Sequence, residues 1–128
     1  MLTYVGKGYS PAFVANYEVI AARLSTGEEI ELVAGPDDIC GPLTADPGAH
    51  CHGASVIERD RSAAEAVSRL IGSPLPLGAR ITPSTALLAR LRKTFATGAI
   101  RAACSGCEWS SLCDHVAEGG YLGVRVAP

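Results

Sequence analysis

Residues 10–27, SPAFVANYEVIAARLSTG, decide the fold class because they contain every feature of an amphipathic helix. Ser10 is a residue type that caps helix N-termini, Pro11 suits the first helical position, and Gly27 suits the position after the last turn. The apolar residues recur at helical spacing, and they are Phe13, Tyr17, Ile20, Ala21 and Leu24. The segment therefore predicts a helix with one face in a hydrophobic core.

Two further segments predict helices. Residues 55–71 begin with Ser55 and Glu58 in the capping-box pattern. Residues 83–96 begin with a proline after a predicted N-cap at Thr82. The residues expected to face the core are Val56, Ala63, Val67 and Leu70 in the first segment and Leu87, Leu88, Leu91 and Phe95 in the second.

The remaining segments predict little regular structure. Residues 28–33 alternate charged and apolar side chains and predict at most a short strand. Residues 40–54 are rich in Gly, Pro and Ala and predict a long loop, residues 99–104 predict a short helix, and residues 118–128 predict a loop or frayed terminus. The predicted fold is mainly α: one small domain over residues 1–128, with three main helices, short helices, a long cysteine-bearing loop and at most a short strand.

Composition limits the classes of partner. The chain has 128 residues and a net charge of −2, so no overall field attracts nucleic acid or an anionic membrane. No apolar run is long enough to span a bilayer, which predicts a soluble cytoplasmic protein with no membrane partner. The basic group Arg90, Arg92 and Lys93 is interpreted as a solvated helix face rather than a nucleic-acid contact, which leaves a protein partner as the open alternative. No motif predicts catalysis, so the sequence favours a protein that is not an enzyme.

Five cysteines are the main chemical feature of the chain. Residues 104–113, CSGCEWSSLC, hold three of them around the only tryptophan. Disulfides are rare in a reducing cytosol, and an odd number of cysteines cannot pair completely, so the cluster favours metal binding over disulfide formation. The two-residue spacer between Cys104 and Cys107 lets both sulfurs approach one metal ion, and Cys113 adds a third donor.

A site with four ligands needs one more donor from elsewhere in the chain. Cys40 and Cys51, both in the predicted loop, are the candidates. Four thiolates suit either an iron–sulfur cluster or zinc, and the spacing leaves the metal open. A zinc site of mixed thiolate and imidazole ligands is an alternative, and its candidate histidines are His50, His52 and His115.

Several stretches of the chain, taken together and in order, resemble a known family. They are YVGKGYSPAFVANY at residues 4–17, ELVAGPDDIC at residues 31–40, RDR at residues 59–61 and CSGCEW at residues 104–109 with a later cysteine. Nearly the whole chain is similar to the domain of unknown function 1284 family, small bacterial and archaeal proteins of uncharacterised function. The resemblance implies iron–sulfur binding, with the candidate ligands Cys40, Cys51, Cys104, Cys107 and Cys113.

Two departures from the family pattern concern candidate ligands. Members begin with a segment resembling RPHHLLC before the tyrosine–glycine stretch, whereas this chain starts at Met1, which is consistent with an internal methionine taken as the start. Members often carry another cysteine at the position of Leu43. Both departures remove donors, so an empty site in this chain is an alternative expectation.

Three functional hypotheses follow. The first is iron–sulfur binding with a redox, sensing or structural role, the second is a structural zinc module that binds protein or nucleic acid, and the third is a metal-free helical interaction domain. The metal hypotheses predict that the sulfurs of Cys104, Cys107 and Cys113 converge, with Cys40 or Cys51 approaching from the loop. They also predict that the Trp109 ring packs beside the cysteines and limits solvent access, whereas the alternative is that Trp109 is an ordinary core residue.

Overall fold

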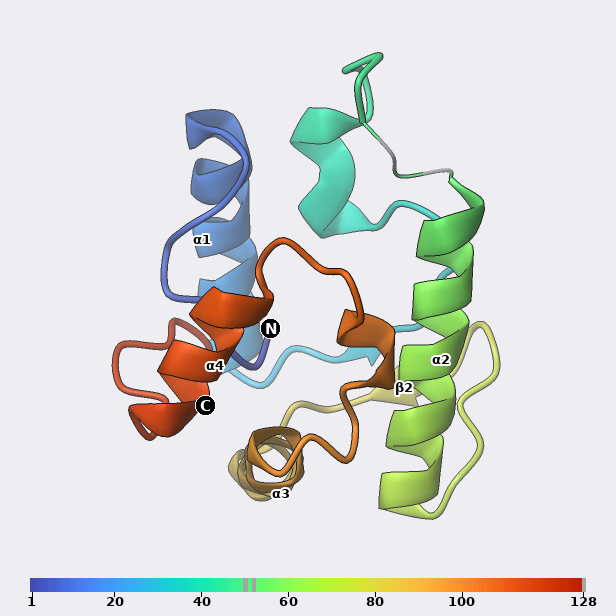
Figure 1. Cartoon of the computed structure of the whole chain (residues 1–128), viewed down its shortest axis with the longest axis vertical. Helices are drawn as coiled ribbons and strands as arrows, with labels where there is room; N and C mark the ends of the chain where they lie inside the picture. The colour runs from blue at the N-terminus through green and yellow to red at the C-terminus, as the bar shows by residue number, and fades with distance from the viewer. Residues whose placement is uncertain (50, 52, 128) are drawn as a thin grey trace.

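The structure is a computed structural model, and it describes residues 1–49, 51 and 53–127. Its regular elements, in chain order, are α1 (Pro11–Ser25), β1 (Ile30–Glu31), η1 (Asp38–Leu43), α2 (Ala54–Ile71), β2 (Arg80–Ile81), α3 (Thr85–Ala96), η2 (Ala102–Cys104) and α4 (Ser110–Glu118) (Figure 1). The prediction of a mainly α fold is confirmed. None of the helices in the described part of the chain combines the length and the apolar character that a bilayer crossing requires.

Helix α1 forms as the sequence predicts. The Ser10 hydroxyl accepts a hydrogen bond from the Phe13 amide at 3.1 Å, so the first turn is capped. Every apolar residue of the predicted face is buried. Tyr17 also stacks on the Tyr4 ring, with 3.7 Å between ring centroids, and this contact joins the N-terminal segment to the helix.

The hydrophobic core lies between α1, α3 and the two ends of the chain. Leu88 and Leu91 of α3 are buried against the α1 face, together with Tyr4 and Val126. Val126 has 0% exposure, although residues 118–128 were expected to form a loop or frayed terminus. The segment forms the expected loop, and it is not frayed, because its residue Val126 is buried in the core.

Hydrogen bonds with the N-terminal segment and with α3 anchor the C-terminal segment. The Arg125 amide donates to the Tyr4 carbonyl at 2.9 Å, and the Arg92 guanidinium donates to the Val126 carbonyl at 2.6 Å and to the Leu2 carbonyl at 3.3 Å. Arg92 also lies over the Tyr121 ring. The interpretation of Arg92 as part of a solvated face is therefore wrong, because its guanidinium forms hydrogen bonds that connect both ends of the chain to α3.

Two predicted helix starts are shifted. Helix α2 begins after Gly53, which makes no side-chain cap, so the predicted capping box of Ser55 and Glu58 is not formed. Helix α3 is capped by Ser84, whose hydroxyl accepts from the Leu87 amide at 3.3 Å, instead of by Thr82. The helices themselves occupy the predicted segments.

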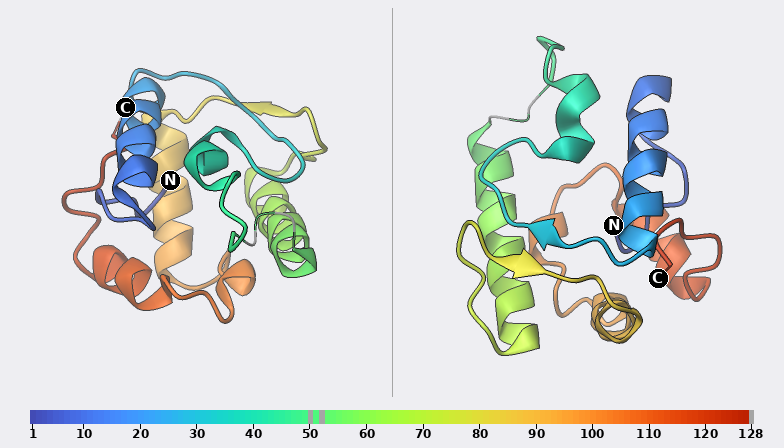
Figure 2. Two further views of the ribbon diagram at one scale, coloured as in Figure 1. Left: turned by 90° about the horizontal axis from the view of Figure 1, so that it is seen from above. Right: turned by 180° about the vertical axis from the view of Figure 1, so that it is seen from behind.

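Three elements were not predicted. The Asp37 carboxylate caps η1 by accepting from the amides of Ile39 and Cys40, inside the segment predicted as a loop. Strand β2 is the second: it pairs antiparallel with β1, the short strand expected within residues 28–33, with Ile30 opposite Ile81, and the two strands lie side by side in Figure 2. Helix α4 follows the cysteine motif directly and carries Cys113.

Candidate functional site

The CxxC motif forms a closed turn. Cys104 ends η2, and the Cys107 amide donates to the Cys104 carbonyl at 3.0 Å. Gly106 has a φ of +68°, a left-handed conformation that glycine adopts without strain. Cys104 and Cys107 therefore sit on either side of one tight turn, as their spacing predicts, and both are half-buried free thiols.

Arg101 holds this turn between α3 and α4. Its guanidinium pairs with Asp114, donates to the Ser110 hydroxyl at 3.3 Å and lies 4.6 Å from the centroid of the Phe95 ring. The hydrogen bond with Asp114 raises the pKa of Arg101; burial opposes this shift, and the neighbouring Cys104 thiol adds to it. A fixed positive charge therefore lies beside one sulfur of the motif. Sequence reasoning missed this residue.

Cys113 and His115 lie on different sides of α4. The Cys113 sulfur is 3.2 Å from the Thr3 hydroxyl oxygen, while His115 is exposed. Two positions along an α-helix correspond to a rotation of about 200°, so the two side chains point in nearly opposite directions. His115 is therefore placed poorly to share an ion with Cys113.

Cys40 and Cys51 line a cleft between η1 and α2. Burial, followed by the charge of Asp37 and the neighbouring Cys51 sulfur, raises the pKa of Cys40 to about 11. The backbone hydrogen bond with Asp37 acts in the opposite direction. Cys40 is therefore a protonated thiol at neutral pH, and it must release its proton to bind a metal.

We expect the alkylation rate of Cys40 by iodoacetamide to rise up to about pH 11 in the folded protein. In the urea-unfolded chain the rate should level off above the ordinary thiol pKa of about 8.5. The pKa of Cys40 is higher in the folded than in the unfolded protein, so the protonated thiol adds to the free energy of unfolding at pH values below its pKa in the unfolded chain. This contribution is lost as the pH rises through the pKa of Cys40 in the folded protein. Peptide-resolved mass spectrometry measures both profiles, and coincident midpoints would contradict the expectation.

The cysteines do not form one preassembled site. The described residues contain no group of three or more His, Cys, Asp or Glu side chains placed to hold one metal ion. The predicted convergence of the sulfurs of Cys104, Cys107 and Cys113 is therefore not seen in this conformation. His50 and His52 lie outside the described residues, so their role as alternative ligands stays a prediction.

Trp109 packs against an aromatic residue of the N-terminal segment. Its ring meets that of Tyr9 edge to face, with 5.3 Å between centroids. Its indole nitrogen is buried and has no hydrogen-bond partner among the described residues. The aromatic contact fixes the segment between Cys107 and Cys113, but the structure places no cysteine cluster beside the ring.

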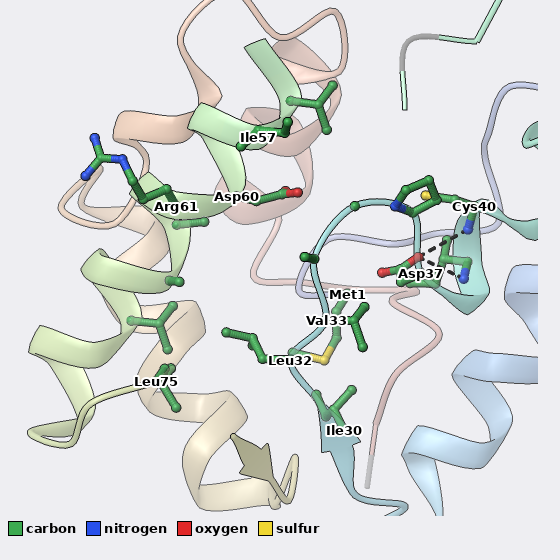
Figure 3. A pocket seen from close by; sticks show the side chains of 18 of the residues that line it. Met1, Ile30, Leu32, Val33, Asp37, Cys40, Ile57, Asp60, Arg61 and Leu75 are labelled. Atoms are coloured by element: carbon green, nitrogen blue, oxygen red, sulfur yellow. Dashed lines mark hydrogen bonds between the residues drawn. The ribbon is translucent and has the colours of Figure 1, made fainter. Parts of the chain in front are cut away.

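The cleft lined by Cys40 and Cys51 has a volume of about 1950 Å³. Ile30, Val33, Asp37 and Cys40 lie on one wall, and Ile57 and Asp60 lie on the α2 wall (Figure 3). Glu108 of the cysteine motif also lines it, so segments from both halves of the chain border one space. This cleft was not predicted, because its apolar lining residues have the same periodicity as core residues.

Comparison with known proteins identifies the family. A model of the family described as "Protein of unknown function (DUF1284)" matches residues 8–113, a range that starts before α1 and includes all five cysteines. Neither the curated proteins nor the solved structures contain a significant match. The family match spans well over half of the chain, so this protein belongs to the family of proteins of unknown function DUF1284.

Proposed function

We propose that this protein binds an iron–sulfur cluster through four of its five cysteines. The observation that carries the proposal is the Cys104–Cys107 turn, closed by a hydrogen bond, with the Arg101 guanidinium beside the first sulfur. Two thiolates on one turn are half of the ligand set that a cluster requires. Hydrogen bonds and positive charge near ligand sulfurs stabilise the anionic cluster and set its reduction potential.

The chemistry of the other donors fits the proposal. Cys40, Cys51 and Cys113 are also free and half-buried. Thiolates are the ligands that iron–sulfur clusters prefer, and His115, the one described histidine among the alternative ligands, is turned away from Cys113. These observations favour a thiolate ligand set over a mixed set of thiolate and imidazole.

The placement of the donors implies that binding changes the conformation. Because the described donors are not assembled around one point, a cluster must draw the segment of Cys40 and Cys51 towards the Cys104–Cys107 turn. Residues 44–49 follow η1 without belonging to a helix or strand, and their described hydrogen bonds join them only to neighbours within residues 41–49, so a movement of this segment breaks no described hydrogen bond to α1 or α2. Cluster binding is then coupled to folding of this region.

Anaerobic purification followed by iron and acid-labile sulfide analysis tests the proposal. We expect stoichiometric iron and sulfide in the wild-type protein and their loss in the double variant Cys104→Ser, Cys107→Ser. Ser105→Ala, an exposed change within the same turn, is the matched control and should retain the cluster. One tightly bound zinc without sulfide would identify the structural zinc alternative. Intact thiols without any metal would identify the metal-free alternative.

A further inference from the structure

The middle of the chain lacks a filled core. Between Leu24 and Leu88, Ala66 and Pro83 are the only buried residues in the described part of the sequence. Many apolar side chains of this region line the cleft, where they are half-buried or exposed. Some partly buried ones also pack against the core, and these include Ile30, Ile39, Leu43, Val67 and Leu70. Apolar surface on both walls of one cleft is a feature of protein interaction sites.

Helix α2 forms one complete wall of the cleft. It lies on the opposite side of the molecule from α1, and its main contact is with η2 (Figures 1 and 2). Its residues that line the cleft include Val56, Ala63, Ala64, Val67 and Ile71, which recur at helical spacing. An 18-residue helix is about 27 Å long, so the apolar wall has nearly that length.

The size of the cleft favours a segment of polypeptide over a small molecule. Small-molecule sites typically enclose about 300–1000 Å³, whereas this cleft has about 1950 Å³. A cylinder about 10 Å across and about 25 Å long, the envelope of a helix of roughly 16 residues, has a similar volume. The length of that helix matches the α2 wall.

The charge of the cleft is negative. Its lining contains six acidic side chains and two arginines. Glu65 pairs with Arg61, and Glu31 pairs with Arg80, but Asp60 forms no ion pair with any described residue. Asp60 points from α2 towards the wall that carries Asp37 (Figure 3). The pKa of Asp60 is raised by burial and by the charge of Asp37, so a cation between the two carboxylates would relieve their repulsion.

We propose that the cleft binds an amphipathic, basic α-helix of a partner protein. The apolar face of that helix packs between α2 and β1, and a lysine or arginine lies between Asp37 and Asp60. Helix binding in an apolar groove is a common mode of peptide recognition, and the acidic side chains that line the cleft favour basic helices. Cys40 and Cys51 line the cleft and would move in the proposed cluster binding, so this proposal concerns the protein without a bound cluster, and its test does not require metal.

A synthetic helical peptide of roughly 16 residues, with leucines on one face and lysines on the other, is the first probe. We expect saturable binding to the full-length protein by fluorescence anisotropy, weakening as the salt concentration increases. The same peptide with glutamate in place of lysine should bind at least about tenfold more weakly. A scrambled peptide of identical composition, which cannot form an apolar face, is the second control.

Variants of the cleft locate the binding. Asp60→Asn should weaken binding of the lysine peptide by about threefold, the range of an exposed ion pair. Asp38→Asn, at an exposed position outside the cleft lining, is the matched control and should leave the affinity unchanged. Ala64→Arg, which fills the α2 wall with a bulky cation, should weaken binding by about tenfold. Circular dichroism of each variant verifies that the fold is retained.

Four results would overturn the proposal. The first is equal affinity for the lysine and glutamate peptides, and the second is unchanged binding in Asp60→Asn and Ala64→Arg. The third is binding of a fatty acid or naphthalene-sulfonate dye in the cleft without binding of the peptide, which would identify a small-molecule site. The fourth is a concentration-dependent dimer that Ala64→Arg dissociates, which would identify a second copy of this chain as the occupant. Repeating the measurements on chelator-treated protein tests peptide binding in the absence of metal, so the result does not depend on whether the iron–sulfur proposal is correct.

Discussion

Replacing Leu88 by alanine should lower the free energy of unfolding by about 3 kcal/mol, within the range for buried leucines that are truncated. Leu88 is 1% exposed and lies where α3 meets α1. The loss combines the transfer free energy of three carbon atoms with the cavity that remains after partial relaxation. Urea denaturation followed by circular dichroism measures the change as a shift of the midpoint at constant slope.

Leu122→Ala is the matched control for Leu88→Ala, because it removes the same atoms from a side chain that is 82% exposed. It should change the free energy of unfolding by less than about 0.5 kcal/mol. Similar losses in both variants would contradict a core centred on α1 and α3. A small core makes this position especially sensitive, since α2 contributes only Ala66 to the buried residues in the described part of the chain.

The sequence predicted the elements whose signals are local. Helix α1 has its cap, its proline and its apolar face within one segment, and the structure confirms all three. Helix α3 has a strong apolar repeat, so it formed even though its cap moved from Thr82 to Ser84. Helical periodicity extends over many residues and tolerates an error in one capping residue, whereas the exact cap depends on a single side chain.

The missed elements depend on distant partners. Strand β2 has two residues, and its extended conformation is defined by pairing with β1, about fifty positions earlier. Val126 is buried because Arg92 of α3 holds the last residues against the core. Helix α4 starts after Trp109 without a side-chain cap, so its beginning carries no local start signal.

In the candidate site too, the locally determined features were predictable and those that depend on distant contacts were not. The turn of Cys104 and Cys107 was predictable, because a two-residue spacer and a glycine determine it locally. The relative positions of Cys40, Cys51 and Cys113 depend on how η1 and α4 pack, and the expected convergence was not observed. Arg101 was not singled out because its partner Asp114 becomes a neighbour only when α4 folds back onto α3.

The second large effect on stability is expected from replacing Arg101, because its side chain packs between α3 and α4. Arg101→Ala should lower the free energy of unfolding by about 2 kcal/mol, since it removes a charged hydrogen bond and the contact with Phe95. The Arg101 side chain is 18% exposed, but Asp114 is 47% exposed. Asp114 therefore stays hydrated when it loses its partner, and the loss is smaller than the roughly 3–5 kcal/mol of a fully buried broken pair.

Arg101→Lys separates charge from geometry, because lysine keeps the positive charge but lacks the planar fork that reaches both Asp114 and Ser110. We expect it to recover less than half of the stability lost in Arg101→Ala. Arg69→Ala, at an exposed position of α2, is the control and should be nearly neutral. Equal stability of Arg101→Ala and Arg69→Ala would show that the guanidinium does not connect α3, α4 and the cysteine turn. The same side chain holds the turn beside Cys104, so Arg101→Ala should lower both the free energy of unfolding and the iron content of the protein. If Arg101 acted on the cluster only through its charge, Arg101→Lys would keep the iron content of the wild type.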